Sequence, residues 1–263
     1  MLNLLTEISP EFSEHISKYV EGSKEYLLQI IKPDGTCPSL GDSSKAVGIS
    51  SLKNIMYNNK EYLYLTSKGK HGTQPTNEMV FEEGGYAIFR SSWKDSAEDA
   101  TWMLFNAATF SSTHKHGDDL EVLIFHKGDL FVEAGKRDYN YADSQTTWAY
   151  SGYGHNVLLV DGEAYPVKTE ANGFQSIYPD AIKTGITNYS INKNICSVTG
   201  SQYRFNEIEQ TRTLRYYKNE NIVDIEDIIQ SERNYGGALL WHLAEGIMAK
   251  ETDGGWNLFR GAL

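Results

Sequence analysis

The sequence has few residues that could cross-link the chain or carry it across a membrane. Two cysteines occur among 263 residues, and the wide separation of Cys37 and Cys196 matches no metal-binding spacing and predicts no particular disulfide. There is no run of about 18 apolar residues, so the sequence predicts no membrane-spanning helix. The first twenty residues carry acidic side chains and no continuous apolar stretch, and they do not predict a signal peptide.

Positive charge is also scarce. The chain has 24 Lys and Arg against 35 Asp and Glu, a net charge of −11, which argues against a general nucleic-acid-binding surface. A single cleft can still be basic, so an anionic sugar remains a possible ligand. The 40% hydrophobic content is enough for a sizeable core, and the 17 tyrosines suit both strands and stacking on sugar rings.

The first part of the chain has a helical pattern. Ser9 is a suitable N-cap, Pro10 suits the first helical position, and Glu11 suits the first turn. Apolar residues then recur at helical spacing until Pro33, where the helix must end. Residues 51–64 predict one or two further short helices, and residues 68–77 are polar and rich in helix breakers, which is typical of a linker.

From about residue 80 the pattern is typical of strands separated by turns, with no helices between them. The expected strands cover residues 85–93, 101–109, the hairpin 120–135, 157–160, 175–178, 195–199, the hairpin 209–229, and 238–243. Strands at such intervals predict an antiparallel β-sandwich. We therefore expect a helical segment and linker over residues 1–77 and a sandwich domain over residues 78–263. The last ten residues predict no closing strand, as if the chain were a fragment.

Polar residues gather at the ends of the central predicted strands. His114 and His116 are two residues apart, so on a strand they point to the same side. Glu133 ends the following hairpin, and His155 precedes another apolar run. If the turns bring these side chains together, they form a nitrogen and oxygen ligand set that suits zinc or a similar divalent ion.

Two families share parts of this pattern. The first is the cupins, whose first motif is similar to His114-x-His116, Glu121 and Gly128, with Gly154-His155 as a possible second half. In that scheme Glu121, instead of Glu133, would bind the metal. Glu121 lies within an apolar run, however, and the glycine expected before the first histidine is missing.

The second resemblance, to the C-terminal β-domain of the heparinase II/III-like polysaccharide lyases, covers roughly residues 25 to 245. The residues that carry it are 85–91, Trp93, His114-x-His116-x-Asp118, Gly128, 133–135, Tyr139, Tyr141, His155-Asn156 and Asp161-Gly162. Upstream, residues 33–36 and 41–43 resemble the last helix-loop segment of that family's α/α toroid. The resemblance implies a mainly β fold, with a large antiparallel sandwich preceded by a short helical remnant of the toroid.

The same resemblance implies a metal site and a catalytic pair. It makes His116, Glu133 and His155 the ligands of a structural divalent ion, for which zinc is the expected metal. His114 then faces the substrate, and Tyr141 is the expected catalytic tyrosine. The family usually has Asp at the position of Glu133, but glutamate also binds zinc.

Three further residues near these positions are expected to bind substrate: Lys115, Arg137 and Tyr139. The implied substrate is an acidic polysaccharide containing uronic acid, such as heparan sulfate or alginate, and the implied reaction is β-elimination. That reaction needs neutralisation of the uronate carboxylate, a base for the C5 proton and an acid for the departing O4. An unperturbed histidine can act as base or acid near neutral pH, which suits His114.

In this family the neutralising group lies in the toroid. We therefore expect this chain alone to be inactive, and to need toroid helices or a second copy of the chain as a partner. The resemblance also implies a periplasmic, cell-envelope or secreted location. Two alternatives to a lyase remain: a cupin-like metal-dependent enzyme, and a non-catalytic carbohydrate-binding β-domain.

Overall fold

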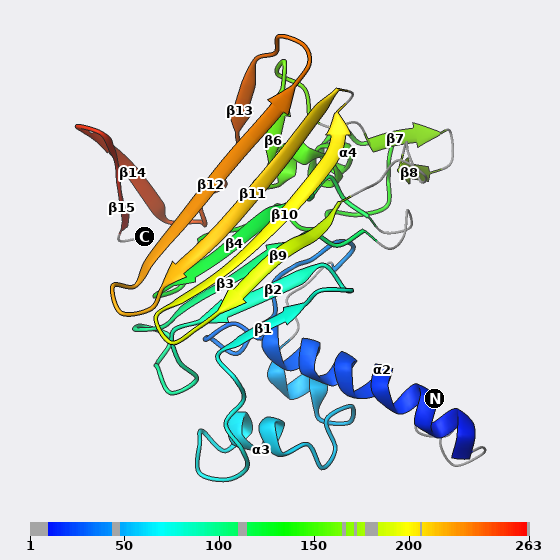
Figure 1. Cartoon of the computed structure of the whole chain (residues 1–263), viewed down its shortest axis with the longest axis vertical. Coiled ribbons are helices and arrows are strands. Elements are labelled where there is room, and N and C mark those ends of the chain that lie inside the picture. Colours follow the sequence, from blue (N-terminus) through cyan, green and yellow to red (C-terminus); the bar gives the residue numbers. More distant parts are fainter. Residues whose placement is uncertain are drawn as a thin grey trace.

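The computed structural model describes residues 10–43, 48–109, 115–164, 167–170, 173–176, 184–205 and 207–261. His114, the expected catalytic histidine, lies outside these residues. Within them the fold is mainly β, and its two largest sheets face each other with a helical segment below them (Figure 1). The predicted antiparallel β-sandwich is confirmed. Among the described residues, no helix is long and apolar enough to cross a membrane.

The helical segment consists of α2 (Pro10–Gln29), η1 (Ile49–Leu52) and α3 (Lys60–Thr66). Its apolar residues pack on one face of the first sheet, where Leu28 and Ile31 join a cluster with Ile88, Trp102 and Leu104. Burying each such side chain stabilises the fold by roughly 1.5–3 kcal/mol. The helices therefore cover a sheet face that would otherwise be exposed to water.

The first sheet has five antiparallel strands in chain order: β1 (Glu78–Phe81), β2 (Tyr86–Arg90), β3 (Thr101–Asn106), β4 (Glu121–His126) and β5 (Asp129–Phe131). Every residue of β3 is buried, because the helical segment covers one face of the sheet and the second sheet covers the other. This double coverage explains why these strands read as continuous apolar runs.

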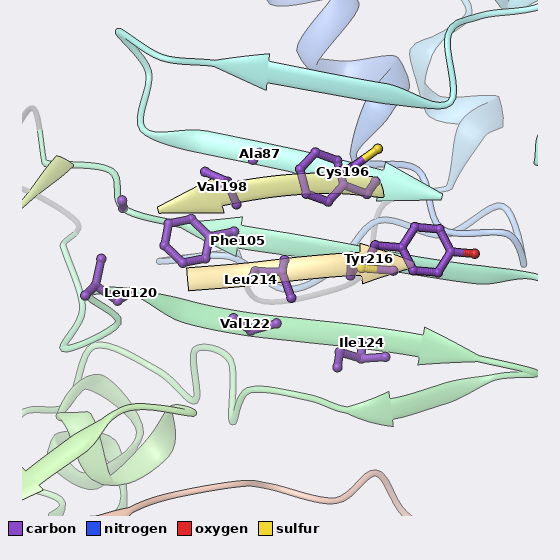
Figure 2. Close-up of a cluster of buried hydrophobic side chains, with 12 residues drawn as sticks. Ala87, Phe105, Leu120, Val122, Ile124, Cys196, Val198, Leu214 and Tyr216 are labelled. Atoms are coloured by element: carbon purple, nitrogen blue, oxygen red, sulfur yellow. The ribbon is translucent and has the colours of Figure 1, made fainter. Parts of the chain in front are cut away.

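The second sheet has four antiparallel strands: β9 (Gly185–Ile191), β10 (Ile195–Phe205), β11 (Ile208–Tyr217) and β12 (Ile222–Ser231). Buried and partly buried residues alternate along β11, as expected for a sheet with one face toward the core. Figure 2 shows that core, in which Phe105 and Val122 of the first sheet lie between the sheets with Val198 and Leu214 of the second.

Three smaller strand pairs complete the described fold: β6 (Leu158–Val160) with β13 (Gly237–Leu239), β7 (Val167–Glu170) with β8 (Gly173–Ser176), and β14 (Ile247–Thr252) with β15 (Gly255–Arg260). The expectation that the end of the chain lacks a strand was wrong, because residues 255–260 form β15. These residues are mostly exposed, so burial gives no alternating signal there.

The expectation of no helix between the strands was also wrong. Helix α4 (Ser144–Tyr150) and the 3-10 turn η2 (Gly152–Gly154) lie between β5 and β6. The composition of α4, with two threonines, a tryptophan and a tyrosine, favours strands. The N-cap favours the helix over the strand preference of these residues, because the Asp143 carboxylate accepts a hydrogen bond from the Gln145 N–H.

Candidate functional site

Two carboxylates and a histidine meet at one end of the first sheet. Glu121 is the first residue of β4, Glu133 follows β5, and His155 follows η2. Their ligand atoms all lie within 4.8 Å of one another. His155 Nδ1 is 3.4 Å from Glu121 Oε2 and 3.3 Å from Glu133 Oε2, and all three side chains are buried. We call these three residues the Glu–Glu–His cluster.

Most polar atoms of this cluster lack a hydrogen bond. Among the described residues, no hydrogen bond is made by Glu121 Oε2, by either oxygen of Glu133, or by either ring nitrogen of His155, although His155 Nδ1 lies within ion-pair distance of both carboxylates. A buried polar atom without a partner costs about 1–3 kcal/mol, and a charged one costs more. A divalent cation would satisfy these atoms together, and carboxylate oxygen with imidazole nitrogen is a donor set that zinc accepts. The residues present therefore fit a metal ion.

The close approach of the two carboxylates also shifts the pKa values of Glu133 and His155. Burial, together with the neighbouring Glu121 carboxylate, raises the pKa of Glu133 well above its usual value. Burial alone would lower the pKa of His155, but the two carboxylates raise it well above its usual value. The crowding of the two carboxylates contributes to both shifts, whereas burial adds to the shift of Glu133 and opposes that of His155.

His116 lies beside the Glu–Glu–His cluster but is not one of its members. Its ring centroid is 5.4 Å from that of His155, and its side chain is fully buried. Its Nε2 lies 3.2 Å from Asp42 Oδ1, while its Nδ1 is buried without a hydrogen bond among the described residues. Burial and the nearby His155 lower the pKa of His116, which favours the neutral ring that can bind a metal.

A glycine fixes the loop that carries His116. The Gly117 N–H donates to the Tyr150 carbonyl at 2.9 Å, so the loop lies directly against the end of α4. A Cβ at Gly117 would come within 2.4 Å of the Gly152 nitrogen. Only glycine allows this approach, and the approach sets the position of His116 relative to His155.

Three tyrosines lie near His116, one in direct contact with its ring and two through a neighbouring residue. The Tyr150 ring lies 4.2 Å from the His116 ring, and the Tyr141 ring lies 5.6 Å from the Tyr150 ring. The Tyr139 hydroxyl is 3.4 Å from Asp42 Oδ2. Burial raises the pKa of Tyr150 above its usual value, and its hydrogen bond with Asp42 adds to this. The structure thus brings the predicted Tyr139 and Tyr141 close to the predicted metal ligands.

The two basic residues expected to bind substrate have different surroundings. The Lys115 ammonium group is buried and forms an ion pair with Asp118, and it lies 3.4 Å from Asp119. Its positive charge is therefore neutralised by buried carboxylates of the same chain. Arg137 is half exposed and its Nε lies 3.2 Å from Asp143, which leaves its guanidinium accessible to solvent.

Asn156 makes hydrogen bonds to several of the elements that surround the site. Its side-chain Nδ2 donates to the carbonyls of Val122 and Val132, and its side-chain Oδ1 accepts from the His242 N–H at 2.7 Å. Its own backbone N–H donates to Glu121 Oε1 at 3.1 Å. One buried residue therefore joins β4, the segment after β5 and the segment after β13, and it holds the carboxylate of Glu121.

We expect Asn156→Ala to lower the free energy of unfolding by about 2–5 kcal/mol, because buried carbonyls and an N–H lose their partners. Urea unfolding of the purified chain measures this. The matched control is Asn140→Ala, an exposed residue whose side-chain oxygen accepts from the Ala142 N–H within its own turn. Its cost should stay below about 1 kcal/mol. Equal losses in the two variants would contradict the role given to Asn156.

Asp118 should make the stability of the metal-free chain sensitive to acid. Burial opposes its ionisation, but the Lys115 ammonium and the neighbouring histidines outweigh this and lower its pKa to about 2. A folded-state pKa below the unfolded value gives a stabilising contribution that is complete above about pH 4 and is lost as pH falls toward 2. Its size is on the order of 2 kcal/mol.

We therefore expect the free energy of unfolding of Asp118→Asn to depend less on pH between about 4 and 2 than that of the parent. Chemical unfolding at each pH measures the difference. Asp34→Asn, which changes a more exposed carboxylate, serves as the control and should keep the parent's pH dependence. An unchanged slope in Asp118→Asn would show that another group carries the effect.

The fold and the site define a class: a two-sheet antiparallel β-domain with a carboxylate and histidine cluster at a sheet end, preceded by helices. The family model described as heparinase II/III-like, C-terminal, matches residues 73–261. The chain therefore belongs to the heparinase II/III-like family, which is a family of polysaccharide lyases. No curated protein matches the sequence.

Two solved structures share the fold. A heparinase III gene product has a TM-score of 0.73 and 20% identity, over 93% of this chain and 36% of its own. The heparan sulfate lyase HepC from Pedobacter heparinus has a TM-score of 0.72 and 20% identity, over 89% of this chain and 36% of its own. The chain thus spans about a third of the length of these proteins.

Two residues of the site were not singled out by the sequence analysis: Asp42, noted only as part of a toroid-like loop, and Tyr150. Apart from that resemblance, Asp42 stands between Gly41 and Ser43, which is typical of any turn. Glu121 was assigned only to the cupin scheme, as an alternative to Glu133. The structure places both carboxylates beside His155, so the choice between them does not separate the two schemes.

Proposed function

We propose that this chain forms the β-domain side of the active site of a polysaccharide lyase that cleaves uronic-acid-containing polymers by β-elimination. The observation that carries the proposal is the convergence of Tyr139, Tyr141 and His116 next to the Glu–Glu–His cluster, in a chain of the heparinase II/III-like family. Hydroxyl and imidazole groups are the proton donors and acceptors that the reaction needs.

We further propose that Glu133 and His155 hold a divalent ion, with zinc the best fit, together with His116 through Nδ1. Glu121 Oε2 faces the same place and is a fourth candidate ligand. When bound, the ion would supply positive charge that holds the two carboxylates and the strand ends together. Its role in this proposal is structural, and the proton transfers belong to other groups.

In the proposed mechanism, His114 and Tyr141 act on the substrate. One takes the C5 proton of the uronate, and the other donates a proton to the departing O4. Tyr139 and Arg137, both exposed at the rim, contact the acidic chain. The group that neutralises the uronate carboxylate is expected in the toroid, so the activity belongs to a protein that contains it.

The test uses the product of the whole reading frame, incubated separately with heparan sulfate, heparin and alginate. β-Elimination leaves a double bond conjugated with the carboxylate, so ultraviolet absorbance should rise together with new reducing ends. New reducing ends without that absorbance would indicate hydrolysis and contradict the proposal. Binding without cleavage of any of the three would favour a non-catalytic carbohydrate-binding domain.

A further inference from the structure

Asp42 joins the helical segment to the site although it lies 74 positions before His116 in the sequence. It follows α2 in a loop that resembles the family's last toroid loop, and its side chain is 13% exposed. One of its carboxylate oxygens lies 3.2 Å from His116 Nε2, and the other lies 3.4 Å from the Tyr139 hydroxyl. Tyr150 also hydrogen-bonds this carboxylate.

The chemistry of this contact selects one form of the His116 ring. An ionised carboxylate only accepts hydrogen bonds, so Nε2 must carry the hydrogen. In a neutral imidazole the other nitrogen, Nδ1, then has the free lone pair. Nδ1 is the buried atom of His116 that makes no hydrogen bond among the described residues. Histidines that bind metals commonly donate their second N–H to a carboxylate in this way.

The same carboxylate reaches the residues at the rim of the site. The hydroxyls of Tyr139 and Tyr150 can donate to it, and the Tyr150 ring lies 4.2 Å from the His116 ring. The helical segment packs on the first sheet, as Figure 1 shows. The position of Asp42 relative to His116 therefore depends on that packing.

We propose that Asp42 is a positioning residue, which holds His116 in the Nε2-protonated tautomer and leaves Nδ1 free to bind a metal ion. The claim that Nδ1 binds a metal ion rests on the function proposed above. The claim that Asp42 selects the His116 tautomer does not. The helical segment thereby contributes to a site whose candidate ligands all belong to the β-domain.

The experiment compares three variants of the chain with the parent. Asp42→Ala removes the acceptor, and Asp42→Asn keeps an oxygen that can still accept from Nε2. Asp34→Ala is the matched control, because Asp34 lies on the same segment, accepts from Thr36 within its own turn and lies 3.8 Å from the Lys32 ammonium. Two quantities are measured: the Zn²⁺ dissociation constant by competition with a chelator, and the His116 tautomer in the metal-free chain by ¹⁵N NMR of labelled histidines.

We expect Asp42→Ala to weaken Zn²⁺ binding by about 10–100-fold and to lose the preference for the Nε2-protonated tautomer. Asp42→Asn should recover much of the Zn²⁺ affinity and of the tautomer preference, and Asp34→Ala should change neither quantity. An unchanged tautomer in Asp42→Ala would overturn the inference, as would equal weakening of Zn²⁺ binding in Asp42→Ala and Asp34→Ala. If the parent binds no Zn²⁺, the metal proposal fails, and the tautomer result alone decides the role of Asp42.

Discussion

Alanine in place of His155 should deprive the purified chain of bound Zn²⁺ and lower its melting temperature. His155 Nδ1 lies 3.3 Å from one carboxylate and 3.4 Å from the other, so in our proposal it is the central ligand of the Glu–Glu–His cluster. Without it, two buried carboxylates would hold the ion with fewer donors. A ligand present at a hundred times its dissociation constant stabilises the folded state by about 2.7 kcal/mol, and this contribution would be lost.

The measurement is metal content by mass spectrometry, together with thermal unfolding with and without a chelator. The parent should lose stability when the chelator is added, and His155→Ala should start lower and respond little. His71→Ala is the control, because His71 is an exposed residue of the linker. A parent that carries no metal and ignores the chelator would remove the metal ion from the proposed function.

The second prediction is that alanine variants of His114 and His116, two positions apart in the sequence, lose different properties. His116→Ala removes a proposed metal ligand, so metal content and melting temperature should both fall. His114→Ala leaves the ligand set intact, so both should stay near the parent's values. In the product of the whole reading frame, however, His114→Ala should lower the rate of β-elimination by about 10²–10⁴-fold, the range for loss of a general acid or base.

The cupin-like alternative predicts a different result, because in that scheme both histidines bind the ion. Metal analysis of the two purified variants therefore distinguishes the schemes without any activity assay. Equal metal loss in both variants would remove His114 from the catalytic residues and make it a ligand. A normal rate in His114→Ala with full metal content would assign the proton transfer to another group, of which Tyr141 is the first candidate.

Much of the fold follows from local patterns in the sequence. Helix α2 covers Pro10–Gln29 and ends before Pro33, as the turn signals there predict, while the predicted N-cap Ser9 lies outside the described residues. The hairpin of β11 and β12 forms where apolar alternation and the turn between them indicate it. These elements were predictable because their side chains repeat with the period of the backbone. The pair β14 and β15 was not, since its mostly exposed residues carry no such repeat.

The sequence by itself also determined which residue types could form a site, namely His116, Glu133 and His155. It predicts His116 at a strand end, whereas the structure places it in the loop between β3 and β4. Only the tertiary structure decided that Glu121 lies with Glu133 beside His155, because strand pairing brings together residues whose separation in the sequence carries no distance information. The same holds for Asp42, which reaches His116 through the packing of the helical segment on the first sheet. Local periodicity specifies an element and its buried face, whereas contacts between elements depend on how all the buried faces pack at once.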